Sequence, residues 1–207
     1  MRYATASGLT IVMLGDWNKL YTQPDWIASN IFESDEMEIG VSGQDAFMDI
    51  SFKCNNIVIN SKQDRFVFSA MNTDIDTLNE LTKIISNFSA KAHTPVMVAY
   101  GINIDYVEED TSIFANVLDS IPDTSILINN GYQIESTEIK RALSIDDKII
   151  NMDCKQSGSI LQIHFNEHHE SSELTPKINV VVLNEFIEKC NNIVRSLGYE
   201  LEGDEIE

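Results

Sequence analysis

A long run of apolar residues near the middle of the chain, residues 93–106 (HTPVMVAYGINIDY), constrains the fold more than any other feature. Its side chains are apolar at both odd and even positions, which is typical of a strand buried on both faces. Pro95 prevents a preceding helix from entering the run and favours an extended backbone at Thr94. We therefore predict a central strand over residues 95–106, with the rest of the chain added around it.

Groups of turn-forming residues divide the sequence on either side of this run into short strands. The turns come at the spacing of hairpins, so antiparallel meanders are the simplest arrangement. The Asn130-Gly131 pair is a strong signal, because both central residues of a type I′ turn need a positive φ angle. It predicts a hairpin between strands 124–129 and 132–143. The other expected strands cover residues 8–14, 39–41, 47–53, 57–60, 65–71, 148–155 and 160–166.

Two long amphipathic helices are expected, one in each half of the chain. Thr73, followed three residues later by Asp76, is a variant of the capping box, and apolar residues at helical spacing come after it. After a polar loop over residues 167–173, Thr175-Pro176 predicts the start of the last helix and Gly198 predicts its end. Shorter helices are expected over residues 24–32 and 112–119.

Each half of the chain therefore has the same plan, an antiparallel meander followed by an amphipathic helix. We predict an α+β protein with an N-terminal half, residues 1–107, and a C-terminal half, residues 108–207. The two halves are expected to form one compact unit around the 95–106 strand. The shared plan suggests an internal duplication, and the two helices contain the similar segments LNEL at 78–81 and LNEF at 183–186.

One hexapeptide, KCNNIV, occurs twice, at residues 53–58 and 189–194. The surrounding patterns predict a hairpin for the first copy and a helix for the second. Because the six residues are identical, tertiary context has to decide both conformations.

The charge of the chain is strongly unbalanced, since 33 acidic and 14 basic residues give a net charge of −19. Such a chain repels nucleic-acid phosphates and anionic membranes unless its basic residues are gathered in one place. They are scattered, and only Lys140-Arg141 are adjacent. The natural electrostatic partners are therefore basic proteins or surfaces that normally hold nucleic acid. A role in solubility alone is the simpler interpretation.

Three cysteines, Cys54, Cys154 and Cys190, lie far apart in apolar patterns, and no C-x-x-C pair exists. This spacing argues against a disulfide framework and a zinc knuckle, and favours a reducing cytoplasm. The apolar stretch at residues 9–14 is too short for the core of a signal peptide. No run approaches the roughly 20 apolar residues of a membrane helix. We therefore expect a cytoplasmic protein.

The first candidate for chemistry is Pro122-Asp123 together with Glu138 and Lys140, which fits the PD…(D/E)xK pattern of metal-dependent nucleases. In such sites two carboxylates hold Mg²⁺, which activates a water molecule, and the lysine supports the nucleophile or the developing charge. In the predicted Asn130-Gly131 hairpin, Asp123 lies opposite Glu138 and Lys140 points to the same face. The pattern is short and arises by chance in acidic chains, so a solvated pair of opposite charges is the simpler interpretation.

The second candidate is the segment 164–170 (HFNEHHE), which contains three of the four histidines. On an extended strand His164, Asn166 and His168 share a face, so His164 and His168 could present two imidazoles to Zn²⁺ or another transition metal. The spacing is not that of a helical zinc motif. The end of a strand that runs into a polar loop is the simpler interpretation.

Three segments, 24–27 (PDWI), 93–103 (HTPVMVAYGIN) and 164–169 (HFNEHH), resemble a set of uncharacterised bacterial proteins of about this length. The resemblance runs over most of the chain, and its motifs are signatures of a fold more than of a site. It implies a soluble α+β protein of bacterial or phage origin, and it brings no catalytic role with it.

The leading hypothesis is a non-enzymatic binding protein whose acidic surface engages a basic protein. It could act as an inhibitor or as a nucleic-acid mimic on a nucleic-acid-handling partner. No cofactor is expected, and neither nucleic acid nor a membrane is an expected direct partner. The first alternative is a nuclease that uses Mg²⁺ with Asp123, Glu138 and Lys140. The second is an oligomeric scaffold in which sheet edges or helices pair between copies.

Overall fold

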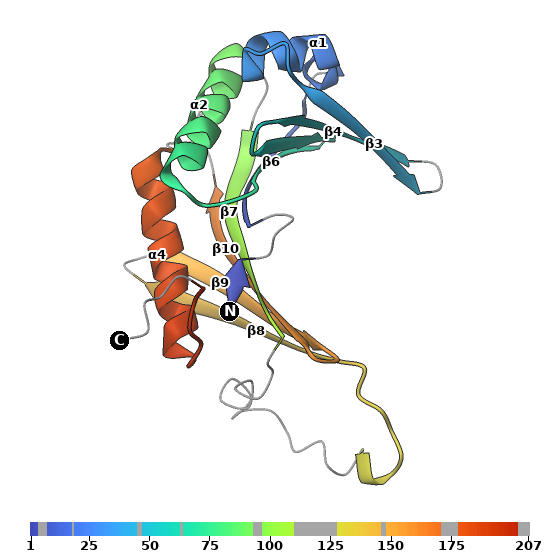
Figure 1. The fold of residues 1–207 in the computed structure, drawn as a ribbon, viewed down its shortest axis with the longest axis vertical. Coiled ribbons are helices and arrows are strands. Elements are labelled where there is room, and N and C mark those ends of the chain that lie inside the picture. The colour runs from blue at the N-terminus through green and yellow to red at the C-terminus, as the bar shows by residue number, and fades with distance from the viewer. Residues whose placement is uncertain are drawn as a thin grey trace.

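A ten-stranded antiparallel sheet with two long helices on one of its faces makes up the computed structural model of the chain (Figure 1). The fold is therefore α+β and rich in strands. The residues that the structure describes are 1–3, 8–17, 19–44, 47–62, 64–92, 97–109, 128–145, 148–170 and 178–202.

The strands lie in the order β3-β4-β5-β6-β2-β7-β10-β9-β8, and the short β1 pairs with β7 beside this path. Every one of these pairings is antiparallel. The strands are β1 (Arg2–Tyr3), β2 (Leu9–Gly15), β3 (Glu38–Gln44), β4 (Phe47–Cys54), β5 (Ile57–Ser61), β6 (Arg65–Ala70), β7 (Met97–Glu108), β8 (Ser136–Ile145), β9 (Lys148–Ser157) and β10 (Ile160–Glu170).

The strands predicted in the first half are confirmed with small changes of their ends. β3 to β6 form a meander, and β6 pairs with β2. Cys54 pairs with Ile57 across the β4–β5 turn, in which Asn55 has a φ angle of 51°. Asparagine tolerates this left-handed conformation better than most residues, which explains a tight hairpin without glycine.

Short helical segments connect β2 to β3. They are the 3₁₀ turn η1 (Lys19–Thr22), the helix α1 (Pro24–Ile27) and the π-helical turn η2 (Ala28–Phe32). Pro24 lies in the first turn of α1, where its missing N–H costs no hydrogen bond. Ile27 and Ile31 are fully buried, so this connection closes one end of the core next to α2 (Figure 1).

The helix α2 (Ile75–Lys91) is confirmed, but its predicted cap is wrong. Asp74, not Thr73, caps the helix, since its carboxylate accepts a hydrogen bond of 2.8 Å from the backbone N–H of Thr77. The apolar face packs on β5 and β6. Phe88 lies at the centre of an aromatic cluster, with ring centroids 4.6–6.5 Å from those of Trp17, Tyr21, Trp26, Phe66 and Phe68.

The strand predicted over residues 95–106 is present as β7, which pairs with β2 on one side and with β10 on the other. Its middle residues 101–104 are buried. The register with β2 shifts between Leu14 and Gly15, so a bulge lies where the end of β2 pairs with the start of β7.

Three predictions in the second half are wrong. Residues 132–135 are not part of a strand, and Ile128 and Asn129 form a helical turn, so the Asn130-Gly131 hairpin between strands 124–129 and 132–143 is not formed. β8 starts only at Ser136 and pairs with β9. The predicted start of the polar loop over residues 167–173 is also wrong, because β10 continues to Glu170. The helix predicted over 112–119 lies outside the described residues.

The last helix is α4 (Val180–Ser196), and the predicted start at Thr175-Pro176 lies outside the described residues. Asn179 is its N-cap and accepts a hydrogen bond of 3.0 Å from the backbone N–H of Val182. Gly198 follows the helix with a φ angle of 92°, as predicted for its end. The hydroxyl group of the buried Tyr106 donates a 2.7 Å hydrogen bond to Asn191 Oδ1, which fixes α4 on β7.

Both copies of KCNNIV behave as predicted. Residues 53–58 form the end of β4, the turn and the start of β5, and residues 189–194 lie in α4. The cysteines Cys54, Cys154 and Cys190 are buried and form no disulfide. Burial raises the pKa of the Cys154 thiol to about 11, as expected of a cysteine in the core. Within the described residues, no helix has the length and apolar character needed to cross a membrane.

Candidate functional site

The face of the sheet opposite α2 and α4, here called the helix-free face, carries a row of asparagines across its middle strands. Asn103 of β7 pairs with Asn166 of β10, which in turn pairs with Asn151 of β9. Side chains alternate between the two faces of a strand, so the three amides point away from the buried apolar residues that flank them. We call Asn103, Asn166 and Asn151 the amide row.

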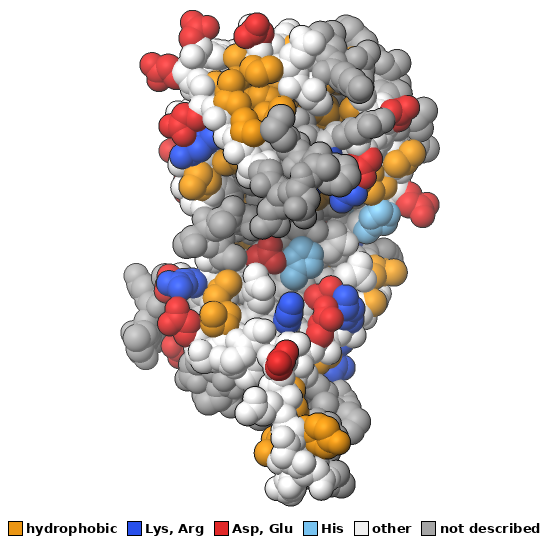
Figure 2. Space-filling model, turned by 90° about the vertical axis from the view of Figure 1, so that its right-hand side faces the viewer, with side chains coloured by type: hydrophobic (Ala, Val, Ile, Leu, Met, Phe, Trp, Pro, Cys, Tyr) orange, Lys and Arg blue, Asp and Glu red, His pale blue; other side chains and the backbone are white. Residues whose placement is uncertain are grey.

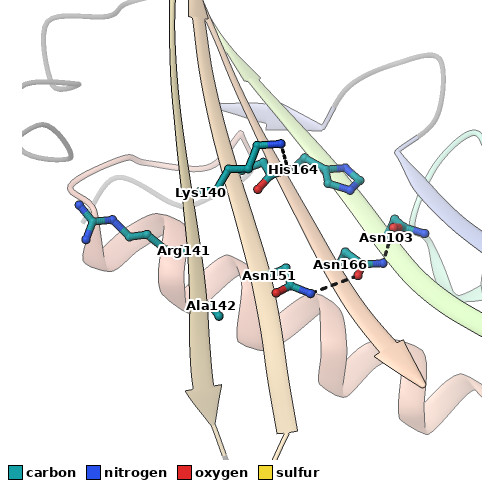
Figure 3. A pocket seen from close by; sticks show the side chains of 8 residues that line it. Asn103, Lys140, Arg141, Ala142, Asn151, His164 and Asn166 are labelled. Carbon is teal, nitrogen blue, oxygen red and sulfur yellow. Dashed lines mark hydrogen bonds and ion pairs between the residues drawn. The ribbon is translucent and has the colours of Figure 1, made fainter. Parts of the chain in front are cut away.

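Hydrogen bonds connect the members of the amide row (Figure 3). Asn166 Nδ2 donates to Asn103 Oδ1 at 2.7 Å, and Asn151 Nδ2 donates to Asn166 Oδ1 at 3.4 Å. Gly101 leaves space for this chain of amides, because a Cβ atom there would lie only 2.9 Å from Asn166 Nδ2. The amides are therefore held in fixed positions on strands.

A charged row lies one step along the same strands. His164 of β10 is flanked by Asp105 of β7 and Asp153 of β9, which is in turn flanked by Lys140 of β8. His164 Nδ1 lies 2.8 Å from Asp105 Oδ1, and Lys140 Nζ lies 3.6 Å from Asp153 Oδ2. The hydrogen bond to Asp105 raises the pKa of His164 above its ordinary value, against the opposing effect of burial.

The two rows enclose an open hollow of about 540 Å³ on the helix-free face. Seven of its eight lining residues have polar or charged side chains, and the Arg141 side chain points away from the amide row (Figure 3). Because His164 Nδ1 is bonded to Asp105, the other ring nitrogen, Nε2, is the one that can contact another molecule. The residues that line the hollow are Asn103, Lys140, Arg141, Ala142, Asn151, Asp153, His164 and Asn166.

Charges of both signs are interspersed on the helix-free face (Figure 2). Lys140 contacts Asp153 and also Glu138, whose Oε1 lies 3.1 Å from Lys140 Nζ. Farther along the sheet, Lys53 lies 3.9 Å from Glu38. The negative charge of the chain is therefore not concentrated around the hollow.

Two of the three residues proposed for a nuclease site lie on this face. Glu138 and Lys140 point to the same side of β8, as predicted, and they are bonded to each other. The cross-strand partner of Glu138 is Lys155, because β8 pairs with β9. Asp123 lies outside the described residues, and the hairpin that was to bring it opposite Glu138 is not formed.

The two histidines proposed as metal ligands share the helix-free face, as the alternation along β10 predicted. His164 is bonded to Asp105, whereas His168 is exposed and four residues away, about 13 Å along an extended strand. Among the described residues, no three His, Cys, Asp or Glu side chains lie close enough together to hold a metal ion.

A second charged cluster lies on the opposite, helix-covered face of the sheet. Glu167 is only 2% exposed, and Lys148 Nζ lies 2.9 Å from its Oε1 atom. His169 Nε2 lies 2.8 Å from the same oxygen without the alignment of a hydrogen bond, and its ring stacks on Tyr100. Burial favours protonation of Glu167, but the two neighbours outweigh it and lower the pKa of the carboxyl group.

Sequence reasoning found His164 but missed its partners. A signal was present, because Asn103 and Asp105 are polar residues at alternate positions in an otherwise apolar run. Two polar side chains on one face of a buried strand indicate that this face is not covered by apolar core. Asn151 and Asp153 repeat the same pattern in β9.

No protein-family model matches the sequence, and no curated protein matches it. Inference about function therefore rests on the geometry and chemistry of the chain itself.

Proposed function

We propose that the protein is a non-enzymatic binding module that holds a basic protein partner on its helix-free face. The observation that carries this proposal is the hollow lined by the amide row and the charged row. Its amides and its histidine are fixed on three neighbouring strands and offer both donors and acceptors. A rigid polar surface of this kind suits recognition of polar groups on another molecule.

The net charge and the hollow act at different distances. The charge of −19 creates a field that attracts a basic partner over about a Debye length of ~10 Å and speeds association. The hollow acts at contact, where the interspersed charges and amides select a partner whose groups pair with them. A protein that normally binds nucleic acid has the positive surface that this long-range attraction requires.

The bonding within the charged row supports a binding role over catalysis. Lys140 is neutralised by Glu138 and Asp153, and its pKa is raised because of the hydrogen bond to Glu138. A lysine whose charge is compensated by two carboxylates is less able to stabilise the negative charge that develops during a cleavage reaction. It is better suited to holding a hydrogen-bond donor in a fixed position at the edge of the hollow.

We also propose that the two halves arose by internal duplication. In the first, β2 is followed by the meander β3 to β6, β6 pairs with β2, and α2 follows. In the second, β7 is followed by β8 to β10, β10 pairs with β7, and α4 follows. A duplication accounts for this repeated order and for the pairing of the first strands, β2 and β7, in the middle of the sheet.

The test is capture of partners on the purified, tagged protein from its native cell extract, with and without nuclease treatment, followed by elution in a salt gradient. The variant Asn166→Leu removes the centre of the amide row, and Asn60→Leu on β5 is the matched control at a distance from the hollow. We expect to capture a basic protein that stays bound after nuclease treatment and elutes as the salt concentration rises. Asn166→Leu should abolish its capture, and Asn60→Leu should not.

Two outcomes would contradict the proposal. The first is a partner that both variants capture equally well, because the hollow would then play no part. The second is cleavage of DNA or RNA that depends on Mg²⁺ or Mn²⁺ and is abolished by Glu138→Ala, which would support the nuclease alternative.

A further inference from the structure

Strand β8 is the outermost strand of the described sheet on the C-terminal side, and its partner there is β9 (Figure 1). Six of its ten side chains are exposed, and the other four are partly exposed. An uncovered edge strand offers a row of N–H and C=O groups to another strand. Within the described part of the chain, the outer edge of β8 is therefore open to pairing with an extended segment of another chain.

The hairpin between β9 and β10 fixes which groups of β8 point outward. Ser157 pairs with Ile160 around a two-residue turn, and the residues that close such a turn bond to each other. By alternation, the odd-numbered residues of β9 bond to β10 and the even-numbered ones bond to β8. Since Ser136 pairs with Ser157, the even-numbered residues of β8 direct their N–H and C=O groups away from the sheet.

The geometry points to a second copy of this chain as the occupant, with β8 paired antiparallel to β8 of its partner about a twofold axis at Ile139. In this register Glu138 lies opposite Lys140 of the other copy, and the same pair repeats on the other side of the axis. Thr137 lies opposite Arg141. Both sheets then continue as one, with their helices on the same side.

The charges of β8 favour this register over the registers that place the twofold axis at a neighbouring residue. A twofold axis at Lys140 or at Arg141 places each of these cations opposite its own copy, which is unfavourable. An axis at Ala142 leaves Lys140 opposite Ser144 and provides no opposite charge. The axis at Ile139 allows the two 3.1 Å contacts between Glu138 and Lys140, one within each copy, to be exchanged for two such contacts between copies.

The edge of β8 is also a favourable place for two acidic copies to meet. Residues 136–142 contain one acidic and two basic side chains, a net charge of +1 in a chain of −19. They include the one adjacent pair of basic residues in the sequence, Lys140-Arg141. Repulsion between the copies is therefore smaller here than at an acidic surface.

Disulfide trapping tests the register. Ile139→Cys places two cysteines directly opposite at a non-hydrogen-bonded pair, where the Cα atoms are about 4.5 Å apart and within the range of a disulfide. We expect a covalent dimer after mild oxidation. Leu143→Cys is the matched control, because it lies on the same strand and face but opposite Glu135, and it should form no covalent dimer. The native cysteines are buried.

Charge exchange tests the pairing without a new covalent bond. In sedimentation velocity over a concentration series, we expect a dimer for the natural chain and at least tenfold weaker association for Glu138→Lys. The double variant E138K/K140E exchanges the charges of each pair and should restore association.

Four results would overturn the proposal. They are a monomer at every concentration, equal cross-linking of both cysteine variants, association that is indifferent to the charge variants, and open-ended assemblies. The last would indicate that β8 pairs with the other edge strand, β3, of the next copy.

Discussion

The two copies of KCNNIV allow a matched experiment on how context changes the effect of one substitution. Asn55 and Asn191 are the third residue of each copy, the first in a hairpin turn and the second in α4. We predict that replacing each by alanine and by glycine gives opposite orders of stability. Comparing alanine with glycine at one site cancels the loss of the asparagine side chain.

The magnitudes follow from the backbone at each site. Asn55 has a φ angle of 51°, where alanine costs about 1–2 kcal/mol and glycine costs little, so Asn55→Gly should be the more stable variant by about 1 kcal/mol. Asn191 lies within α4, where glycine costs about 1 kcal/mol more than alanine. Asn191→Ala should therefore be the more stable variant by a similar amount.

Urea denaturation followed by far-ultraviolet circular dichroism measures the four free energies of unfolding. With a slope of about 3 kcal/mol per molar urea, each difference shifts the midpoint by about 0.3 M, in opposite directions at the two sites. The same order at both sites would refute the reasoning, since it would mean that the hairpin and helix backbones do not differ as described. Both variants at Asn191 should also lose the hydrogen bond from Tyr106.

Three further results are expected. Phe88→Ala should destabilise the protein by about 3–5 kcal/mol in urea denaturation followed by tryptophan fluorescence, because it empties the centre of the aromatic cluster; a loss below about 1 kcal/mol would contradict this packing. Asp105→Asn should lower the pKa of His164, measured by NMR titration, and an unchanged value would show that their contact does not raise it. That contact stabilises the folded chain fully below the ordinary histidine pKa and less as pH rises through the raised value. Lys148→Met should cost about 1–3 kcal/mol at pH 7 because it leaves the buried Glu167 carboxylate short of a partner, and the cost should shrink in acid as that group is protonated; an equal cost at pH 7 and pH 4 would refute this.

Much of the secondary structure follows from local pattern. Alternating apolar residues predict the meander of the first half, and apolar residues at helical spacing predict α2 and α4. The errors lie where two local signals compete. Thr73 and Asp74 are both good caps, and the geometry of the first turn selects Asp74. Asn130-Gly131 favours a tight turn, but no strand precedes β8 there to make a hairpin in the described chain.

The candidate site was less predictable than the fold. The sequence identified His164 and the shared face of Glu138 and Lys140, since alternation along one strand is a local property. It did not identify Asp105 as the partner of His164, because the two residues are 59 positions apart. Their contact depends on which strands are neighbours and in which register.

The sequence by itself determined the apolar periodicity, the net charge and most element boundaries, because each depends on residues within one turn or one strand. Tertiary structure decided the conformation of the two identical hexapeptides and the assembly of the amide row. A six-residue segment gains too little from its own propensity to fix its conformation. Burial of Cys54 on the core side of β4 and of Cys190 on the buried face of α4 provides the difference, and only the folded chain supplies those surroundings.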